Sequence, residues 1–439
     1  MEERLLESEE KDISDLKRRI WVEQKKIWKV GFPSMLARVT QYGMFVVTQA
    51  FIGRVGDVQL AGYALVQIIT VRFANGFLLG MSSATETLCG QAFGAGQHYM
   101  MGIYLQRSWI INMVTATLLL PVFIFSGKLF KLIGEEEEIA DAAGYIALCK
   151  LNWGIPGAMS SMIISSWLVI IGGVVYVFGG WCGNTWKGFT SASLSDLIPV
   201  VKLSISSGIM LCLEVWYNAL LVLLAGYMKN ATTELSALSI CLNISSWELM
   251  LCVGFLTSAS VRVGNELGRG DAKAAKFSVK VILSSSVLMG VFFFVICLAF
   301  DRDMAKIFTT KENVMEAVSD LSILLAFSVL LNSVQALLTG VAVGSGRQGT
   351  VAYINIASYY LGGVPIGVIL GYVAHLQIKG IWIGMVVGVV LQVLILGYIT
   401  ARTNWDEQVK KASDRLNRWS LKSSEEFDDE DSIRERLNG

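Results

Sequence analysis

Ten long stretches of apolar residues recur along the chain, and polar segments separate them. Each stretch approaches or exceeds the length of about 20 residues that an α-helix needs to cross a bilayer. The pattern therefore favours an all-α, polytopic membrane protein. The predicted spans are residues 31–53, 60–89, 107–127, 154–180, 198–226, 235–263, 276–299, 317–343, 349–373 and 378–401.

The composition supports this interpretation. Of the 439 residues, 54% are hydrophobic and 16% are charged, whereas soluble domains are about 45–50% apolar and about 25% charged. The net charge is zero, so no basic field points to a nucleic-acid partner. The cysteines and histidines show no metal-site spacing, and the chain has no phosphate-binding P-loop. We therefore expect no metal, no cofactor, no ATP drive and no enzyme activity.

The lysines and arginines outside the spans predict the orientation of the chain. They gather in the N-terminal tail, in the connection after the sixth span and in the C-terminal tail, three segments that an even number of spans places on one side. By the positive-inside rule that side is the cytosol. We expect residues 1–28 to form a cytosolic N-terminal tail and residues 403–439 a disordered cytosolic C-terminal tail.

An internal repeat joins two glycine-rich helix ends. GMSSATETLCGQAFGAG at 80–96 and GFLTSASVRVGNELGRG at 254–270 share four glycines at a constant offset of 174 residues. Duplicated halves, with a binding site between them, are a hallmark of secondary transporters. We therefore predict two helical lobes, residues 29–190 and residues 191–402.

The first lobe is shorter than the second by about 47 residues, the length of two spans and a turn. The deficit falls near residues 141–151, which begin like a helix but run directly into the next span. Eleven helical residues cover only about 16 Å, too little to cross a bilayer. We infer four plus six spans, derived from an ancestral six plus six. An exon-skipped isoform and a mis-predicted gene model both remain open.

Four charged residues lie inside predicted spans: Arg38, Arg72, Glu214 and Glu248. A charge at the bilayer centre costs roughly 2.5–3.5 kcal/mol on insertion scales, so it needs a use or a partner. Glu214 is our candidate for proton coupling. Asn218 lies one helical turn further on the same face and is placed to share its hydrogen bond. The alternative is that Glu214 forms a structural ion pair.

Further polar and aromatic residues in the spans are candidates to line a substrate cavity. Arg38 and Arg72 would attract anionic groups of a substrate, whereas an aromatic ring would stack on a planar one. The alternatives are snorkelling for Arg38, interhelical polar contacts for the amides and Glu248, and core packing for the tyrosine. The candidate cavity residues are Arg38, Gln41, Arg72, Glu248, Asn332, Gln335 and Tyr359.

Eight stretches of the chain resemble the multidrug and toxic compound extrusion family, and its plant detoxification branch in particular. They are TQAFIGRVG (48–56), ETLCGQAFGAG (86–96), YLQRSWI (104–110), MLCLEVWYNALLVLLAG (210–226), SVRVGNELGRG (260–270), LLNSVQALLTGVAVGSGRQ (330–348), VAYINIASYYLGGVPIGVILGY (351–372) and RTNWD (402–406). The resemblance implies twelve helices in two lobes around a central cavity. It also implies cation-coupled antiport, in plants usually with protons, of organic solutes such as xenobiotics and flavonoids.

The chain departs from the family pattern at three places. The fourth and fifth helices of the family are missing. Asn332 stands where some plant relatives carry an aspartate, and Thr48 stands near the first-helix aspartate of prokaryotic relatives. Glu214 is therefore the better candidate for proton coupling.

The resemblance leads to a prediction for the function: a monomeric, proton-driven antiporter of organic solutes in the vacuolar or plasma membrane of a plant cell. Its expected partners are small organic solutes, protons and the lipid bilayer. The two alternatives are an anion channel-like pathway and a truncated isoform that does not transport.

Overall fold

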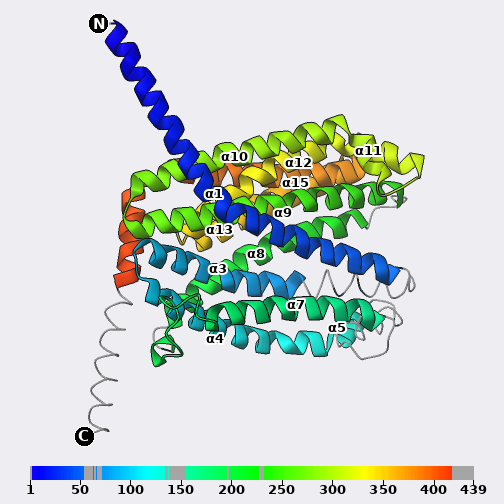
Figure 1. Cartoon of the computed structure of the whole chain (residues 1–439). Coiled ribbons are helices and arrows are strands. Elements are labelled where there is room, and N and C mark those ends of the chain that lie inside the picture. Colours follow the sequence, from blue (N-terminus) through cyan, green and yellow to red (C-terminus); the bar gives the residue numbers. More distant parts are fainter. Residues whose placement is uncertain are drawn as a thin grey trace. The chain divides into compact units, whose positions relative to one another are not determined.

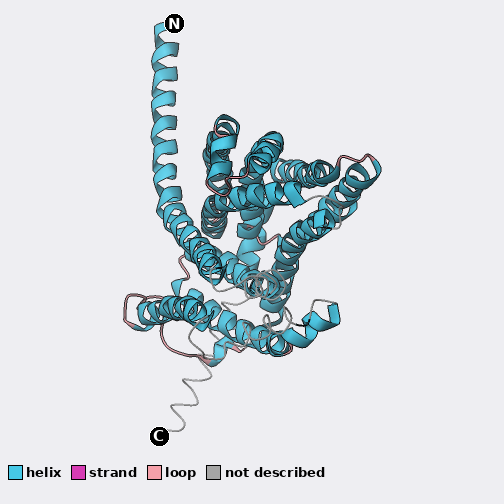
Figure 2. Ribbon diagram, turned by 90° about the vertical axis from the view of Figure 1, so that its right-hand side faces the viewer, coloured by secondary structure: helices cyan, strands magenta, loops and turns pink. Residues whose placement is uncertain are grey.

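The computed structural model describes residues 2–53, 63, 66, 72–133, 137, 155–194, 197–226 and 232–417. Figure 2 shows helices and no strand in this part of the chain, which confirms the all-α prediction. The longer helices are α1 (Glu2–Gly53), α3 (Arg72–Gly94), α4 (His98–Ile124), α7 (Ile155–Phe178), α8 (Leu197–Gly226), α9 (Thr232–Arg269), α10 (Ala272–Ala299), α12 (Glu312–Gly344) and α15 (Gln377–Ala401). The short ones are α5 (Ser126–Ile133), η2 (Ser191–Ser193), α11 (Asp301–Lys306), α13 (Gln348–Asn355), η3 (Ile356–Gly363), α14 (Val364–Val368) and η4 (Ile369–Val373).

Seven helical segments of the described residues are long and apolar enough to cross a membrane: His98–Ile124, Leu197–Tyr217, Ser236–Arg269, Ala272–Ala299, Glu312–Gly344, Gln348–Val373 and Gln377–Ala401. All seven overlap predicted spans. The other three predicted spans fall on α1, on the segment that ends in α3, and on α7. The predicted short helix at 141–151 lies outside the described residues.

The backbone reproduces the sequence repeat at two turns. Gly96 and Gly270 both adopt a left-handed conformation, with φ of 75° and 85°, which glycine adopts without a steric penalty. The amide of Gln97 donates to the Ala92 carbonyl at 2.9 Å, and the amide of Asp271 donates to the Glu266 carbonyl at 2.9 Å. This bond, from an amide to the carbonyl five residues earlier, is the 6→1 hydrogen bond of a Schellman cap. The next helices, α4 and α10, begin at His98 and Ala272, again 174 residues apart.

A second pair of matched glycines permits close helix crossings. A Cβ atom on Gly80 of α3 would overlap the backbone of Gly208 on α8. Gly254 of α9, 174 residues after Gly80, also faces a neighbouring helix: a Cβ atom on it would overlap Met35 Cγ of α1, and the Gly31 carbonyl lies 3.1 Å from the position of that missing Cβ. Small residues, glycine above all, let two helices approach closely.

The chain forms two compact units. Unit 1 holds residues 1–39, 223–345 and 357–410, and unit 2 holds residues 40–222, 346–356 and 411–439. In unit 1, α9, α10, α12 and α15 pack along one another (Figure 1). The beginning of α1 thus belongs with the helices of the second half of the repeat, and most of α8 belongs with those of the first half. The lobe boundary between residues 190 and 191 stays a prediction.

The chain passes from unit 2 to unit 1 inside a predicted span, between Ile356 and Ala357. The same residues begin η3, a π-helix, and a second π-helix, η4, follows in this span. A π-helix bonds each amide to the carbonyl five residues back and is rare outside functional positions.

Candidate functional site

Glu248 is a carboxyl group buried inside a spanning helix of unit 1. Glu248 lies on α9 and is 3% exposed. Its Oε1 atom accepts a hydrogen bond from Cys252 Sγ, one turn further, at 2.6 Å. Its Oε2 atom is buried and has no hydrogen-bond partner among the described residues. A buried polar atom without a partner is rare and points to a group whose partner arrives from outside, such as a proton or a ligand.

Two residues of neighbouring helices complete the surroundings of Glu248. Asn332 of α12 approaches the carboxyl and donates a hydrogen bond from Nδ2 to Ser245 Oγ on α9 at 3.2 Å. Cys297 of α10 lies close enough to interact with it electrostatically. Glu248 and Asn332, two of the predicted cavity residues, are thus brought together. Thiols and amides do not neutralise a carboxylate, and none of the ion pairs among the described residues of unit 1 includes Glu248.

A second polar network joins three helices of unit 1. Gln335 Nε2 on α12 donates to the Tyr359 hydroxyl on η3 at 2.8 Å, and this hydroxyl donates to Gln392 Oε1 on α15 at 2.5 Å. The three side chains are at most 5% exposed. Gln335 and Tyr359 therefore lie together, as interhelical contacts. A satisfied network of this kind rigidifies the helices that it joins.

The remaining predicted residues lie apart from these clusters. Glu214 is half-buried on α8 in unit 2, and Arg38 is half-buried on α1 in unit 1; both take part in polar or electrostatic interactions. Gln41 is exposed. Arg72 and Asn218 lie on α3 and α8, but their side chains are outside the described part of the structure. The role of each in a cavity stays a prediction.

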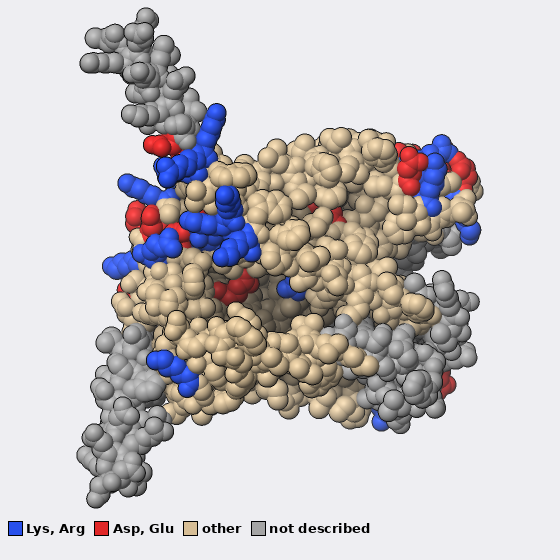
Figure 3. All heavy atoms as spheres, in the orientation of Figure 1, with Lys and Arg blue, Asp and Glu red and all other residues tan. Residues whose placement is uncertain are grey.

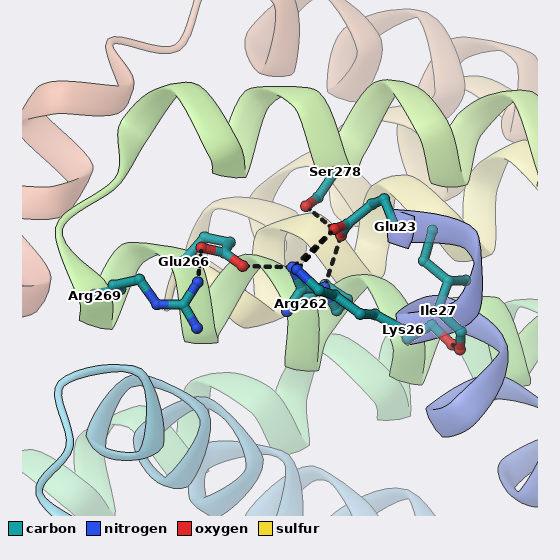
Figure 4. Close-up of polar contacts among 8 residues, drawn as sticks. Glu23, Lys26, Ile27, Arg262, Glu266, Arg269 and Ser278 are labelled. Atoms are coloured by element: carbon teal, nitrogen blue, oxygen red, sulfur yellow. Dashed lines mark hydrogen bonds and ion pairs between the residues drawn. The ribbon is translucent and has the colours of Figure 1, made fainter. Parts of the chain in front are cut away.

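A cluster of charged side chains at one end of unit 1 was not predicted (Figure 4). Arg262 of α9 donates from Nε and Nη2 to the two carboxylate oxygens of Glu23 on α1, at 2.7 and 3.1 Å. Arg262 also pairs with Glu266, one turn further along α9, and Arg269 Nη1 binds the other oxygen of Glu266 at 2.9 Å. Ser278 Oγ of α10 donates to Glu23 at 2.6 Å.

This ionic cluster fastens α1 to α9 and α10. Burial raises the pKa of Glu23, but the hydrogen bonds from Arg262 and Ser278 and the charges of Arg262 and Lys26 outweigh it, and the pKa lies below its ordinary value of 4.5. Glu23 is thus an ionised anchor. The signal in the sequence is Arg262, Glu266 and Arg269, which lie on one helix face at spacings of four and three residues.

The chain is similar to known proteins over nearly its whole length. The profile of the MatE family matches residues 33–178 and 207–369, two segments that begin 174 residues apart. Protein DETOXIFICATION 24 of Arabidopsis thaliana is 45% identical over 481 positions, covering 97% of this chain and 96% of that protein. Protein DETOXIFICATION 21 of the same plant is 46% identical over 463 positions, covering 95% and 94%.

Solved structures show the same fold. The crystal structure of the eukaryotic MATE transporter AtDTX14 superposes with a TM-score of 0.82 at 28% identity, covering 90% of this chain and 99% of that one. The outward-facing structure of a multidrug resistance MATE family transporter matches with a TM-score of 0.77 at 12% identity, which shows the fold alone.

The comparisons also leave positions of the relatives without a counterpart in this chain. The 481 positions shared with DETOXIFICATION 24 hold about 426 residues of this chain (97% of 439), which leaves about 55 positions (481 − 426) without a counterpart. For DETOXIFICATION 21 the same arithmetic leaves about 46 positions (463 − 417, with 95% of 439 aligned). These totals are similar to the deficit of about 47 residues between the halves of the repeat. The place of this deficit near residues 141–151 stays a prediction.

Proposed function

Because this chain belongs to the MatE family of transporters, we propose that it is a secondary active antiporter that exchanges organic solutes for protons. The observation that carries proton coupling is Glu248, a carboxyl buried in a spanning helix with one oxygen unpartnered among the described residues. An ionised carboxylate is costly in such surroundings, so the group gains from taking up a proton.

Glu214 remains the first candidate for the coupling site, and Glu248 is the second. Glu214 lies in the stretch MLCLEVWYNALLVLLAG that carries the family resemblance. Glu248 has the more completely buried environment of the two. Two acids in different compact units offer two places where a proton changes the packing of a helix. A proton gradient then supplies the drive, with no cofactor.

The proposed solutes are xenobiotics and flavonoid-type metabolites, and the proposed location is the vacuolar or plasma membrane with both termini in the cytosol. DETOXIFICATION proteins and multidrug resistance transporters are the relatives that the chain resembles. We propose that the protein works as a monomer.

The test is uptake into proteoliposomes that contain the purified full chain and carry an imposed pH gradient. A fluorescent organic cation and a flavonoid glucoside serve as separate probes. We expect uptake that collapses when the gradient is dissipated. Glu214→Gln should abolish it, and Glu248→Gln should reduce it strongly.

Glu316→Gln is the matched control, because Glu316 is an exposed acid on α12 and should leave uptake unchanged. Uptake that ignores the pH gradient would contradict proton coupling. A probe-independent anion current that persists in Glu214→Gln would favour the channel-like alternative. A folded protein that moves neither probe would favour the non-transporting isoform.

A further inference from the structure

The outward face of α1 carries cations where the helix enters its apolar part. Glu23, Ile27 and Gly31 face α9 and α10. On the opposite face stand three exposed cations, Arg18, Lys25 and Lys29, at spacings of seven and four residues. None of the three forms an ion pair among the described residues.

A second row of cations lies on the first turns of α10. Lys273, Lys276 and Lys280 are exposed and follow one another at spacings of three and four residues, so they share one helix face. Arg19 links the two helices, because its guanidinium lies 4.9 Å from the ring centre of Phe277 on α10. Figure 3 shows Lys and Arg gathered over α1 and the start of α10. We name this surface the basic band: Arg18, Arg19, Lys25, Lys29, Lys273, Lys276 and Lys280.

The acids of these two segments do little to neutralise the band. Between residues 15 and 39 and between 271 and 285, the chain has three acids: Asp15, Glu23 and Asp271. Glu23 turns inward and is neutralised by Arg262. Asp271 accepts a hydrogen bond from the amide of Ala274 at 2.8 Å, which caps α10. The carboxylate of Glu23 is thus paired inside unit 1, and the exposed cations of the basic band are not neutralised by it.

Aromatic side chains stand among the cations of α1. Trp21 is 63% exposed and Phe32 is 59% exposed, and the Lys25 ammonium lies 5.4 Å from the centre of the Trp21 ring. Exposed tryptophan beside lysine, followed by an apolar helix, is the arrangement of residues at the boundary between headgroups and acyl chains. A soluble anion would gain from the cations but not from these rings.

We propose that the basic band is a binding site for the phosphate headgroups of anionic phospholipids. Headgroup phosphates would bind the cations of either row, while Trp21 and Phe32, on the face of α1 that carries Arg18, Lys25 and Lys29, contact the acyl region below. Because Glu23 and Arg262 hold α1 against α9, and Ser278 of α10 binds Glu23, the ionic cluster keeps the two helices that carry these rows in contact.

The test measures lipid binding to the purified full chain in detergent by native mass spectrometry, with phosphatidylinositol 4-phosphate and phosphatidylcholine as probes. Two triple variants remove one row each: R18Q/K25Q/K29Q and K273Q/K276Q/K280Q. Since juxtamembrane cations each attract anionic lipid, each triple variant should lose at least about tenfold in affinity for the anionic lipid. Phosphatidylcholine binding should not change.

The control variant R302Q/K306Q/K311Q removes the same charge from exposed residues beyond the other end of α10, and it should retain the anionic lipid. All variants are first checked for unchanged thermal unfolding. Equal wild-type affinity for both lipids would overturn the proposal, as would an equal loss in the control. Soluble inositol 1,4-bisphosphate binding as tightly as the lipid would assign the band to a soluble anion instead.

Discussion

The turn between α3 and α4 and the turn between α9 and α10 share one backbone conformation, but different side chains are buried beside them. Both close with a left-handed glycine and the same six-to-one hydrogen bond of 2.9 Å. Arg262, Glu266 and Arg269 of the second turn nevertheless match Leu88, Ala92 and Ala95 of the first at the offset of 174. The first turn is packed with apolar groups where the second holds the ionic cluster.

The difference shows that the glycines determine the turn conformation, whereas the side chains near it determine which neighbouring helices pack against it. Leu88 and Ala92 are fully buried in a cluster with Tyr104 and Leu416, the latter from the helix at 405–417. Two amides complete that contact: Gln91 accepts from Arg415 at 3.2 Å, and Thr87 accepts from Gln348 at 2.7 Å. Charges are therefore not needed to cap the repeat, and in unit 1 they bind α1.

The largest expected effect comes from removing the cation at the centre of the ionic cluster. Arg262→Met leaves Glu23 and Glu266 buried without their main partner, and breaking such a pair costs about 3–5 kcal/mol. Thermal unfolding followed by tryptophan fluorescence in detergent measures the loss. The triple variant Glu23→Leu, Arg262→Met, Glu266→Leu imitates the apolar turn and should recover most of it. A triple variant as unstable as the single one would contradict the comparison.

The two matched glycines should differ in their tolerance of a methyl group. Gly80→Ala places its Cβ in the backbone of Gly208, which cannot move aside, and should destabilise by about 1–3 kcal/mol. Gly254→Ala meets mainly the flexible side chain of Met35 and should cost less. The same unfolding experiment ranks the two. Gly208→Ala, whose nearest neighbour atom lies at 3.7 Å, is the tolerated control.

Acid should weaken the attachment of α1 and leave the apolar turn untouched. The pKa of Glu23 is lowered in the folded protein from 4.5, so its contribution to stability is complete above about pH 4.5 and is lost as the pH falls through the lower, folded value. Melting temperatures measured across this range should fall more steeply for the wild type than for Glu23→Gln. Parallel curves would show that Glu23 is not the titrating group.

The smallest effect concerns the residue that follows each glycine. Asp271 caps α10 through the amide of Ala274, whereas Gln97, its counterpart, makes no side-chain cap on α4. Asp271→Gln should destabilise by about 1 kcal/mol and Gln97→Asp should stabilise by a similar amount. Opposite shifts in melting temperature are the expected readout. Two shifts of the same sign would mean that the caps are not equivalent.

The spans and the repeat could be predicted from the sequence because each depends on the residues within one short stretch of the chain. A run of apolar residues such as 378–401 specifies a spanning helix on its own, and Gly96 and Gly270 mark their turns at a constant offset. The packing of α1 with the second half could not be predicted in this way. Hydrophobic periodicity says which face of a helix is buried and leaves open which helix covers it.

The polar clusters were predicted in part for the same reason. Glu248, Asn332, Gln335 and Tyr359 stood out as polar or aromatic residues in spans, and the structure joins them in two pairs. Gln392, a lone amide in an apolar run, was overlooked. The pairing of Glu23 with Arg262 joins residues 239 positions apart, a distance over which local patterns carry no information.

The π-helix at Ile356–Gly363 has a mechanical consequence. It occupies the place where the chain leaves unit 2 for unit 1, so a displacement of either body must pass through its backbone. Each π-type bond encloses one more residue than an α-type bond, so a change from π-helix to α-helix would shift the backbone by that residue. This spanning segment thus contains a candidate hinge, at which the number of residues per turn can change.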